Sequence, residues 1–261
     1  MNKVYTFISA IGKPFANFII HLGAIINVFI SILYSFVYVF KNPYLVIKEI
    51  YYCGVKSLII ISCSGFFVGM VLALQGYNTL SKFGSVSMVG SLVAISLLRE
   101  LGPVLTAILF AARAGSGITA EIGLMKATEQ LEAMNVMAVS PIKRVLAPKF
   151  LGGVISTPLL CGTFNVSGIY GGYVVAVIIL KLDEGSFWSQ MISNIDFHYD
   201  VLNGIIKSIV FAIVINLISV YQGYISKPTP EGVSNATTQT VVNSAIIIFA
   251  LDYILTALMF K

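Results

Sequence analysis

The sequence has few charged residues and few of the residues that build catalytic or metal sites. Only 10% of its 261 residues are Asp, Glu, Lys or Arg, against about a quarter in soluble globular domains. It has two histidines and three cysteines, with neither CxxC nor metal-ligand spacing, so no metal site or disulfide framework is predicted. A GxxxxGK[ST] motif is absent, so the chain is not expected to bind ATP itself. No nucleophile stands beside a plausible base, and an enzyme is therefore not predicted.

Apolar residues take the place of the missing charge. Hydrophobic residues make up 57% of the chain and the mean hydropathy is +0.92. Apolar runs recur at the length of about 20 residues that a membrane-spanning helix needs. The net charge of +5 could suggest nucleic acid, but the basic residues form no continuous stripe, so nucleic acid is not an expected partner. The sequence predicts an all-α integral membrane protein, with residues 1–261 forming one membrane domain.

Five membrane-spanning helices are predicted from these runs. The intervening segment 78–87 and the acidic segment 183–200 read as loops, and 225–234 reads as a turn because it contains two prolines and a glycine. The segment 111–140 is too polar to span. The predicted spans are 57–77, 88–112, 150–180, 202–223 and 240–260.

The first apolar run, 15–40, differs from the others because it carries a polar stripe. Asn17, His21, Asn27, Ser31 and Ser35 fall within roughly a third of a helix circumference. The stripe fits either a helix in the membrane interface or a full span packed with its polar atoms inward, and we favour the interfacial helix. Residues 1–52 are thus predicted as interfacial N-terminal helices and 53–261 as a five-helix bundle.

The distribution of Lys and Arg predicts the orientation. Cytoplasmic loops of membrane proteins carry an excess of both residues. Most of the 16 basic residues lie on one side if the N-terminus is cytoplasmic. That set is Lys3, Lys13, Lys41, Lys48, Lys56, Arg113, Lys126, Lys143, Arg144, Lys149 and Lys227.

The segment between the second and third spans is predicted to form a cytoplasmic helix. Gly115 and Gly117 would let the chain leave the membrane, and Thr119 would cap a helix that begins near Ala120. Apolar residues then recur at helical spacing, with charged residues on other faces. The helix either covers the base of the bundle or is a dock for a soluble subunit. Its residues are Glu121, Leu124, Lys126, Ala127, Glu129, Leu131, Glu132 and Met134.

Arg99 and Glu100 interrupt the second apolar run. A charge at the bilayer centre costs about 2.5–3.5 kcal/mol on insertion scales, so such residues normally face a cavity or a partner. One interpretation is a polar lining for a substrate cavity near the outer side, with Gln75 on the neighbouring span. The other is that the helix begins only near Arg99, with both charges at the interface. Pro103 removes a backbone donor and is expected to bend the helix.

Lys207 and Asp252 are charged residues inside the fourth and fifth predicted spans. At 1.5 Å per residue both lie about 8–12 Å below the outer surface. A structural ion pair between the two helices is the favoured interpretation. A proton relay or a substrate contact is the alternative.

Three segments of the sequence resemble the MlaE family of ABC-transporter permeases. They are SGFFVGMVLALQGY, SLLRELGPVLTAILFAARAGSGITAEIGLMKATEQLEAM and ALDYILTALMF, and the likeness covers nearly the whole chain. The resemblance implies five spans, an interfacial N-terminal helix and a cytoplasmic coupling helix between spans two and three. It also implies a homodimer in a Gram-negative inner membrane. The partners would be a cytoplasmic ATPase (MlaF-like) that binds ATP, a STAS-domain subunit (MlaB-like) and a periplasmic MCE-domain ring (MlaD-like).

The resemblance further implies a function and a site. The family moves phospholipid between the inner and outer membranes and so maintains the lipid asymmetry of the outer membrane. Residues 121–134 would be the coupling helix. The chain has Asn235 and Gln239 where some relatives have basic residues, which departs from any charge-dependent role of that segment. The implied lining of the lipid cavity is Gln75, Leu80, Phe83, Arg99 and Glu100, and Leu72 would extend its apolar wall.

Two functions from different classes follow. The first is a lipid-moving permease driven by a partner ATPase. The second is an ion-coupled secondary transporter or channel that uses Arg99, Glu100 and Asp252 as its charge path. The dock-like helix, together with the lack of paired broken helices, favours the first.

Overall fold

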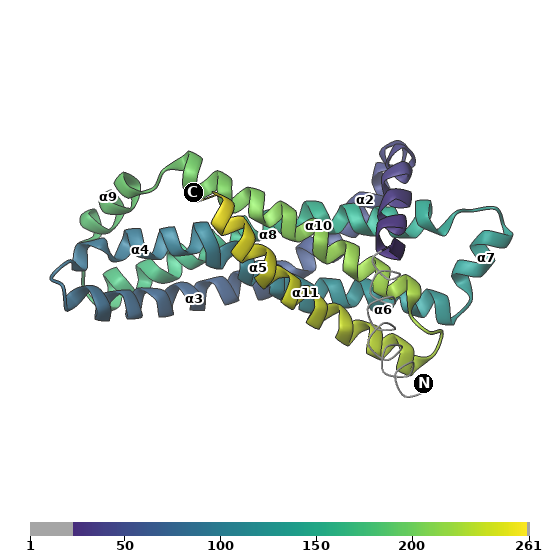
Figure 1. The fold of residues 1–261 in the computed structure, drawn as a ribbon. Helices are drawn as coiled ribbons and strands as arrows, with labels where there is room; N and C mark the ends of the chain where they lie inside the picture. Colours follow the sequence, from purple (N-terminus) through teal and green to yellow (C-terminus); the bar gives the residue numbers. More distant parts are fainter. Residues whose placement is uncertain (1–22, 260–261) are drawn as a thin grey trace, which may run out of the picture.

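The computed structural model describes residues 23–259, apart from the side chains at 197 and 198, and every regular element within that range is a helix (Figure 1). The helices form one elongated bundle, with α4 and α9 at one end and α7 at the other. Short π-helical turns join several of them. The α-helices are α2 (Pro43–Ile50), α3 (Lys56–Ser81), α4 (Val89–Ser96), α5 (Gly102–Phe110), α6 (Ser116–Ala127), α7 (Gln130–Val136), α8 (Ala147–Tyr173), α9 (Glu184–Asn194), α10 (Leu202–Ile225) and α11 (Pro230–Met259).

Six helical stretches of the described residues are long and apolar enough to cross a membrane: Gly23–Lys41, Pro43–Ser81, Val86–Ala127, Ile142–Ile179, Tyr199–Ile225 and Pro230–Met259. Each of the five predicted spans coincides with part of one of the last five, to within one residue at its end. The first lies across the long axis of the bundle (Figure 1). Its interfacial position stays a prediction, and residues 1–22, with Asn17 and His21 of the predicted polar stripe, lie outside the described range.

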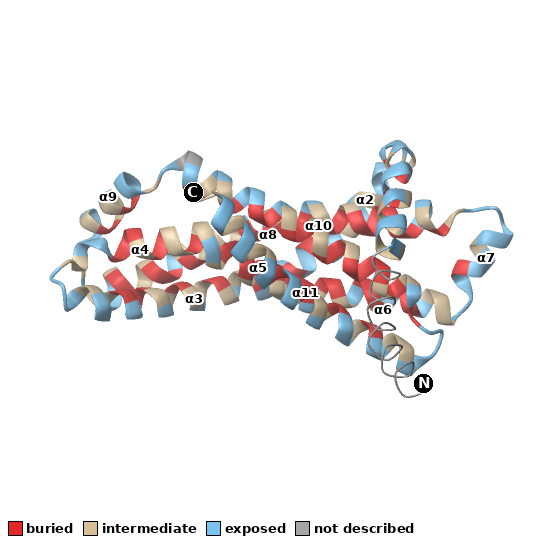
Figure 2. Cartoon of the chain, in the orientation of Figure 1, coloured by how far each residue is buried: buried red, intermediate tan, exposed pale blue. Residues whose placement is uncertain are grey.

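A seam of glycines holds α3 against α8. Gly65 and Gly69 of α3 are buried, and so is Gly168 of α8. A Cβ on Gly65 would lie 2.5 Å from the carbonyl oxygen of Phe164, and one on Gly69 would overlap the carbonyl of Gly168. Small residues allow such close backbone approach between membrane helices. Buried residues follow the middle of the bundle over most of its length (Figure 2).

The second span is much longer than predicted. It begins at Val86, before Arg99, and continues through two π-helical turns to Ala127. Gly115 and Gly117 therefore do not interrupt the helix, and where the chain leaves the membrane stays a prediction. The interpretation in which the helix begins near Arg99 is wrong. Gly115 instead gives α10 room, because a Cβ there would lie 2.8 Å from Ser219 Oγ.

Thr119 lies inside α6 and does not cap it. Its hydroxyl is buried, donates to Ser219 O at 2.9 Å and lies 2.9 Å from Thr240 Oγ1. The polar residues of this segment therefore join α6 to α10 and α11, which satisfies their hydrogen bonds away from water. The same composition had predicted an exit from the membrane.

The predicted single helix over 121–134 is broken in the middle. Glu129 has a left-handed backbone (φ 58°), and the Thr128 hydroxyl donates back to Leu124 O at 2.9 Å. A helix cannot continue through a left-handed residue. As a result α6 ends at Ala127, α7 begins at Gln130, and the predicted apolar residues on the two sides of the break do not share one face.

Three segments predicted as loop or turn contain helix. The acidic loop holds α9, whose first turn is capped by Asp183, since its carboxylate accepts from Ser186 N at 2.7 Å. The predicted turn at 225–234 is shorter than expected, because α11 begins at Pro230. Pro230 is at the first helical position, where its missing N–H costs nothing, and the Thr229 hydroxyl accepts from Gly232 N at 3.1 Å. The loop predicted after the first span is also shorter, because α3 continues to Ser81.

Candidate functional site

The predicted cavity residues lie on the outside of a single chain. Leu72 and Leu80 are half-buried on α3. Gln75 and Glu100 are exposed, and Phe83, just beyond the end of α3, is 76% exposed. A single chain therefore does not enclose these residues, which we call the open wall, and their role as a cavity lining stays a prediction.

Arg99 has a partner that the sequence analysis missed. Its Nε donates to Oδ1 of Asp200, which is fully buried in the turn before α10. Asp200 Oδ2 in turn accepts from the backbone N–H of Asp196 at 2.8 Å. A hydrogen-bonded carboxylate offsets the cost of an arginine within the apolar helix. The available signal was an acid just before the fourth span, at the same outer level as Arg99.

The structure brings Lys207 and Asp252 together. Lys207 Nζ lies 3.0 Å from Asp252 Oδ1 and 2.7 Å from Thr256 Oγ1. The lysine side chain is fully buried, while that of Asp252 is 23% exposed. This pair joins α10 to α11 inside the membrane-spanning part of the bundle.

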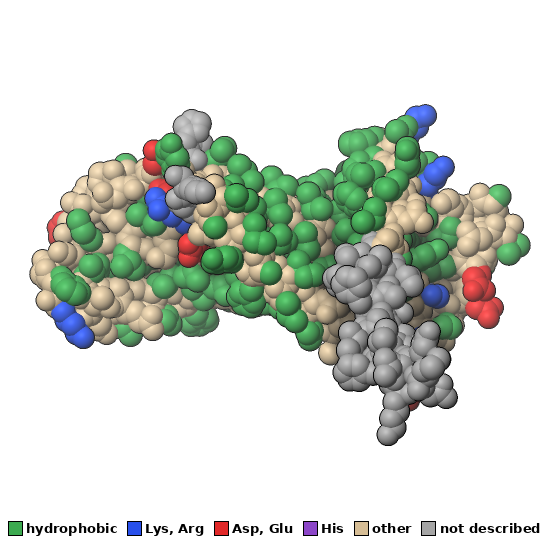
Figure 3. Space-filling model, viewed as in Figure 1, with side chains coloured by type: hydrophobic (Ala, Val, Ile, Leu, Met, Phe, Trp, Pro, Cys, Tyr) green, Lys and Arg blue, Asp and Glu red, His purple; other side chains and the backbone are tan. Residues whose placement is uncertain are grey.

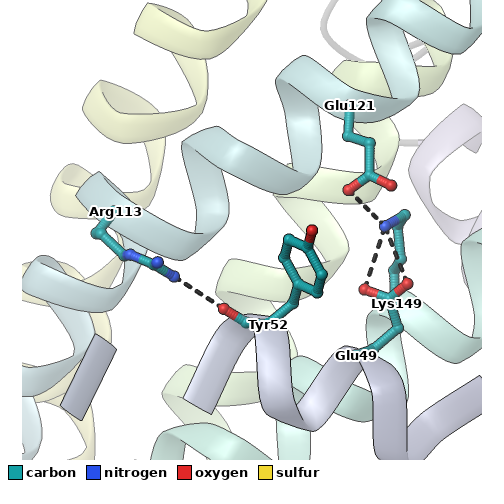
Figure 4. A network of polar contacts seen from close by, with 5 residues as sticks. All are labelled: Glu49, Tyr52, Arg113, Glu121 and Lys149. Carbon is teal, nitrogen blue, oxygen red and sulfur yellow. Dashed lines mark hydrogen bonds and ion pairs between the residues drawn. The ribbon is translucent and has the colours of Figure 1, made fainter. Parts of the chain in front are cut away.

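The predicted coupling residues divide into those that face this chain and those that face outward. Lys126 Nζ donates to Tyr224 O at 2.8 Å, and Leu131 is only 4% exposed. Glu121 contacts Lys149 of α8 at 2.7 Å (Figure 4). Ala127 and Met134 are half-buried. Leu124, Glu129 and Glu132 are exposed.

The exposed apolar surface at this end lies further along the chain than predicted. Val136, the last residue of α7, is 88% exposed, and Met137 is 67% exposed. Acidic side chains appear beside hydrophobic ones at the end of the molecule where α7 lies (Figure 3). We call the stretch from Glu129 to Val139 the tip. Exposed apolar groups with an acidic rim are typical of a surface that binds another protein.

The bundle and these sites define a class. A set of helices long and apolar enough to cross a membrane, joined by ion pairs between them, defines a polytopic membrane protein. The family model described as "Permease MlaE" matches residues 46–258. The chain belongs to the MlaE permease family, and it is a membrane permease of the ABC-transporter type.

Relatives match the chain over most of their own length. The intermembrane phospholipid transport system permease protein MlaE of Haemophilus influenzae is 49% identical over 98% of both chains. A probable ABC transporter permease protein of Rickettsia bellii is 39% identical over 83% of both. A similarly named protein of Synechocystis is 33% identical over 80% of this chain and 79% of its own.

Proposed function

We propose that this chain is the permease subunit of an ABC transporter that moves phospholipids between the inner and outer membranes of a Gram-negative bacterium and maintains the lipid asymmetry of the outer membrane. The observation that supports this proposal most strongly is the 49% identity, over nearly the whole length of the chain, to a protein named for intermembrane phospholipid transport. The chain lies in the inner membrane as a homodimer, and a partner subunit binds and hydrolyses ATP.

The proposed arrangement of partners follows from the two ends of the bundle. With the N-terminus cytoplasmic, the tip lies in the cytoplasm, where an MlaF-like ATPase binds it and an MlaB-like STAS-domain subunit accompanies the ATPase. An MlaD-like ring of MCE domains lies against the opposite, periplasmic end. The excess of Lys and Arg on the tip side supports this orientation.

The proposed lipid site uses the open wall of Leu72, Gln75, Leu80, Phe83, Arg99 and Glu100. A second copy facing this wall would close it into a chamber with apolar sides and a polar rim, which suits two acyl tails and a head group. The Arg99 side chain is 35% exposed. Its guanidinium donates to Asp200 through Nε, and a guanidinium can also bind phosphate in a forked geometry.

The alternative of an ion-coupled transporter or channel gains no support from the geometry. Arg99 is bound to Asp200, and Lys207 to Asp252. Each pair neutralises its own charges within the membrane, which is the arrangement of structural ion pairs.

A photo-crosslinking amino acid at Gln75, Phe83 or Glu100 is expected to capture phospholipid in cells more efficiently than one at Phe67. Phe67 is the control because it lies on α3, as Gln75 does, and is a phenylalanine that is 64% exposed, against 76% for Phe83 just beyond the end of that helix. Mass spectrometry of the crosslinked chain measures the yield. Equal yields at all positions would mean that these residues contact bulk bilayer, and the proposed wall would be abandoned.

Val136→Asp is expected to release the ATPase subunit from the purified complex. An apolar anchor in a docking surface contributes about 1–2 kcal/mol or more, so the ATPase content should fall at least about fivefold at limiting concentration. Leu131→Asp is a poorer test, because Leu131 is buried in this chain and an acid there would disturb the tip itself. Quantitative gel analysis of the affinity-purified complex measures the ratio of subunits.

The control for this prediction is Ile192→Asp. Ile192 is 71% exposed on α9, at the other end of the bundle, so this variant should retain the ATPase fully. Retention of the ATPase by Val136→Asp at the wild-type ratio would show that the tip is not where it docks.

A further inference from the structure

A hollow of about 290 Å³ lies between the segment that connects α2 to α3 and the start of α6. It is separate from the open wall and from the tip. Its lining includes four charged side chains, Glu49, Lys56, Arg113 and Glu121, together with Tyr52 and Gly117.

One side of the hollow carries excess negative charge. Lys149 lies behind it, only 2% exposed, with Nζ 3.1 Å from both carboxylate oxygens of Glu49 and 2.7 Å from Glu121 Oε2. Two carboxylates therefore share one ammonium. The Glu121 side chain is 50% exposed, so the unbalanced negative charge faces the hollow.

The other side carries positive charge. Arg113 Nη1 donates to Tyr52 O at 2.9 Å and to Ser57 Oγ at 3.1 Å, and both acceptors are neutral. Lys56 Nζ lies over the Tyr52 ring, 3.7 Å from its centroid. Among the described residues neither cation forms an ion pair with a carboxylate. Figure 4 shows Tyr52 between Arg113 and the group formed by Glu49, Lys149 and Glu121.

The length of the second span indicates that the hollow lies at the level of lipid head groups. At 1.5 Å per residue the helix from Val86 to Arg113 is about 40 Å long, which matches a bilayer with its head-group layers, about 40–45 Å. Lys56 is the first residue of α3. Tyr51 and Tyr52 are about half exposed beside it, as aromatic residues at a membrane interface commonly are.

We propose that this hollow binds the zwitterionic head group of an aminophospholipid, with the phosphate against Arg113 and Lys56 and the primary ammonium against Glu121. The volume suits a head group and leaves the acyl tails in the bilayer. A head group with no cation would satisfy the basic side but leave the charge of Glu121 unmatched. The proposal rests on the proposed function for the membrane orientation and adds a second lipid site, at the cytoplasmic end.

The test uses the transporter complex in cells whose inner membrane contains phosphatidylethanolamine and phosphatidylglycerol. A photo-crosslinking amino acid replaces Gly117, which has no atom within 4 Å of its Cβ direction and lines the hollow. The control position is Gly162 of α8, which is equally open but lies in a different hollow, against α3. Among the lipids crosslinked at Gly117, the ratio of phosphatidylethanolamine to phosphatidylglycerol should be about three times the ratio in the bulk membrane. At Gly162 the two ratios should be equal.

Charge variants in the Gly117 crosslinking background then separate the two sides of the hollow. Glu121→Gln should abolish the preference for the aminophospholipid, and Arg113→Gln should lower the total lipid captured. Glu231→Gln, a change at an exposed acid near the start of α11, should change neither. The proposal would be overturned if the lipids captured at Gly117 had the head-group ratio of the bulk membrane. It would also be overturned if, in folded complexes, Glu121→Gln left the preference intact or Arg113→Gln left the total lipid captured unchanged.

A competition experiment distinguishes a lipid from a free phosphate ester. Soluble phosphoethanolamine at millimolar concentration should leave lipid capture at Gly117 unchanged, because the tails hold the lipid in place. Displacement of the lipid would overturn the lipid as ligand. If Gly117 showed no head-group preference while Gln75 and Phe83 captured lipid, the proposed function would stand and only this hollow would be abandoned. If Gly117 showed the preference while Gln75 and Phe83 captured no more lipid than Phe67, the open wall would be abandoned and this hollow retained.

Discussion

Gly69→Ala is expected to destabilise the folded chain by about 3 kcal/mol, although it adds only one methyl group. The Cβ would overlap the carbonyl of Gly168 on α8. The overlap is with backbone, so no side-chain rotation relieves it, and α3 must move away from α8. The midpoint of thermal unfolding in detergent, measured by the protein recovered as a sharp size-exclusion peak after heating, should fall by several degrees.

Gly162→Ala is the matched control, because it makes the same change in α8. A Cβ at Gly162 meets no atom within 4 Å, and alanine is about 1 kcal/mol more favourable than glycine in a helix. The midpoint should stay the same or rise slightly. If both variants unfolded at the same temperature, the contact between α3 and α8 would be looser than the structure shows.

Asp252→Asn is expected to cost about 3 kcal/mol, because it leaves the fully buried Lys207 without its carboxylate. Adding Lys207→Gln should cost little more than the single change, since the double variant has no uncompensated charge. The contact of Lys207 with the neutral hydroxyl of Thr256, at 2.7 Å, does not supply a balancing charge. Unfolding midpoints of the four proteins in the cycle measure the coupling.

Glu231→Gln is the control for this prediction, because it also removes an acid from α11. Glu231 is exposed near the start of α11 and lies in no described ion pair, so its change should have no measurable effect. Strictly additive losses for Asp252→Asn and Lys207→Gln would show that the pair contributes no coupling energy.

The parts of the fold that could be predicted depend on the length of the apolar runs and on the depth of a residue within its run. A span must supply about 20 apolar residues, so the centre of each span is visible in composition alone. Lys207 and Asp252 could be placed at one depth by counting residues from the ends of their helices. The side-chain contact between them, at 3.0 Å, follows from that common depth and from the neighbouring positions of α10 and α11.

The parts that could not be predicted depend on local backbone changes and on distant partners. The π-helical turns at Leu97–Leu101 and Ala111–Gly115 each disturb the 3.6-residue period, so a face extrapolated past them is misassigned. The left-handed Glu129 has no glycine or asparagine to signal it. Asp200 stands in a polar stretch where nothing local distinguishes a buried partner of Arg99 from a solvated acid.

The glycine seam between α3 and α8 also bears on the biogenesis of the protein. These helices are separated in the chain by α4, α5, α6 and α7, so α3 enters the bilayer well before the ribosome has made its partner. Until α8 is inserted, the face of α3 on which Gly65 and Gly69 expose the backbone can contact only acyl chains or helices that were synthesised earlier. Membrane helices generally insert first and associate afterwards. For this chain the order of synthesis therefore makes the closing of its tightest helix pair a late event, which follows translation of the whole tip.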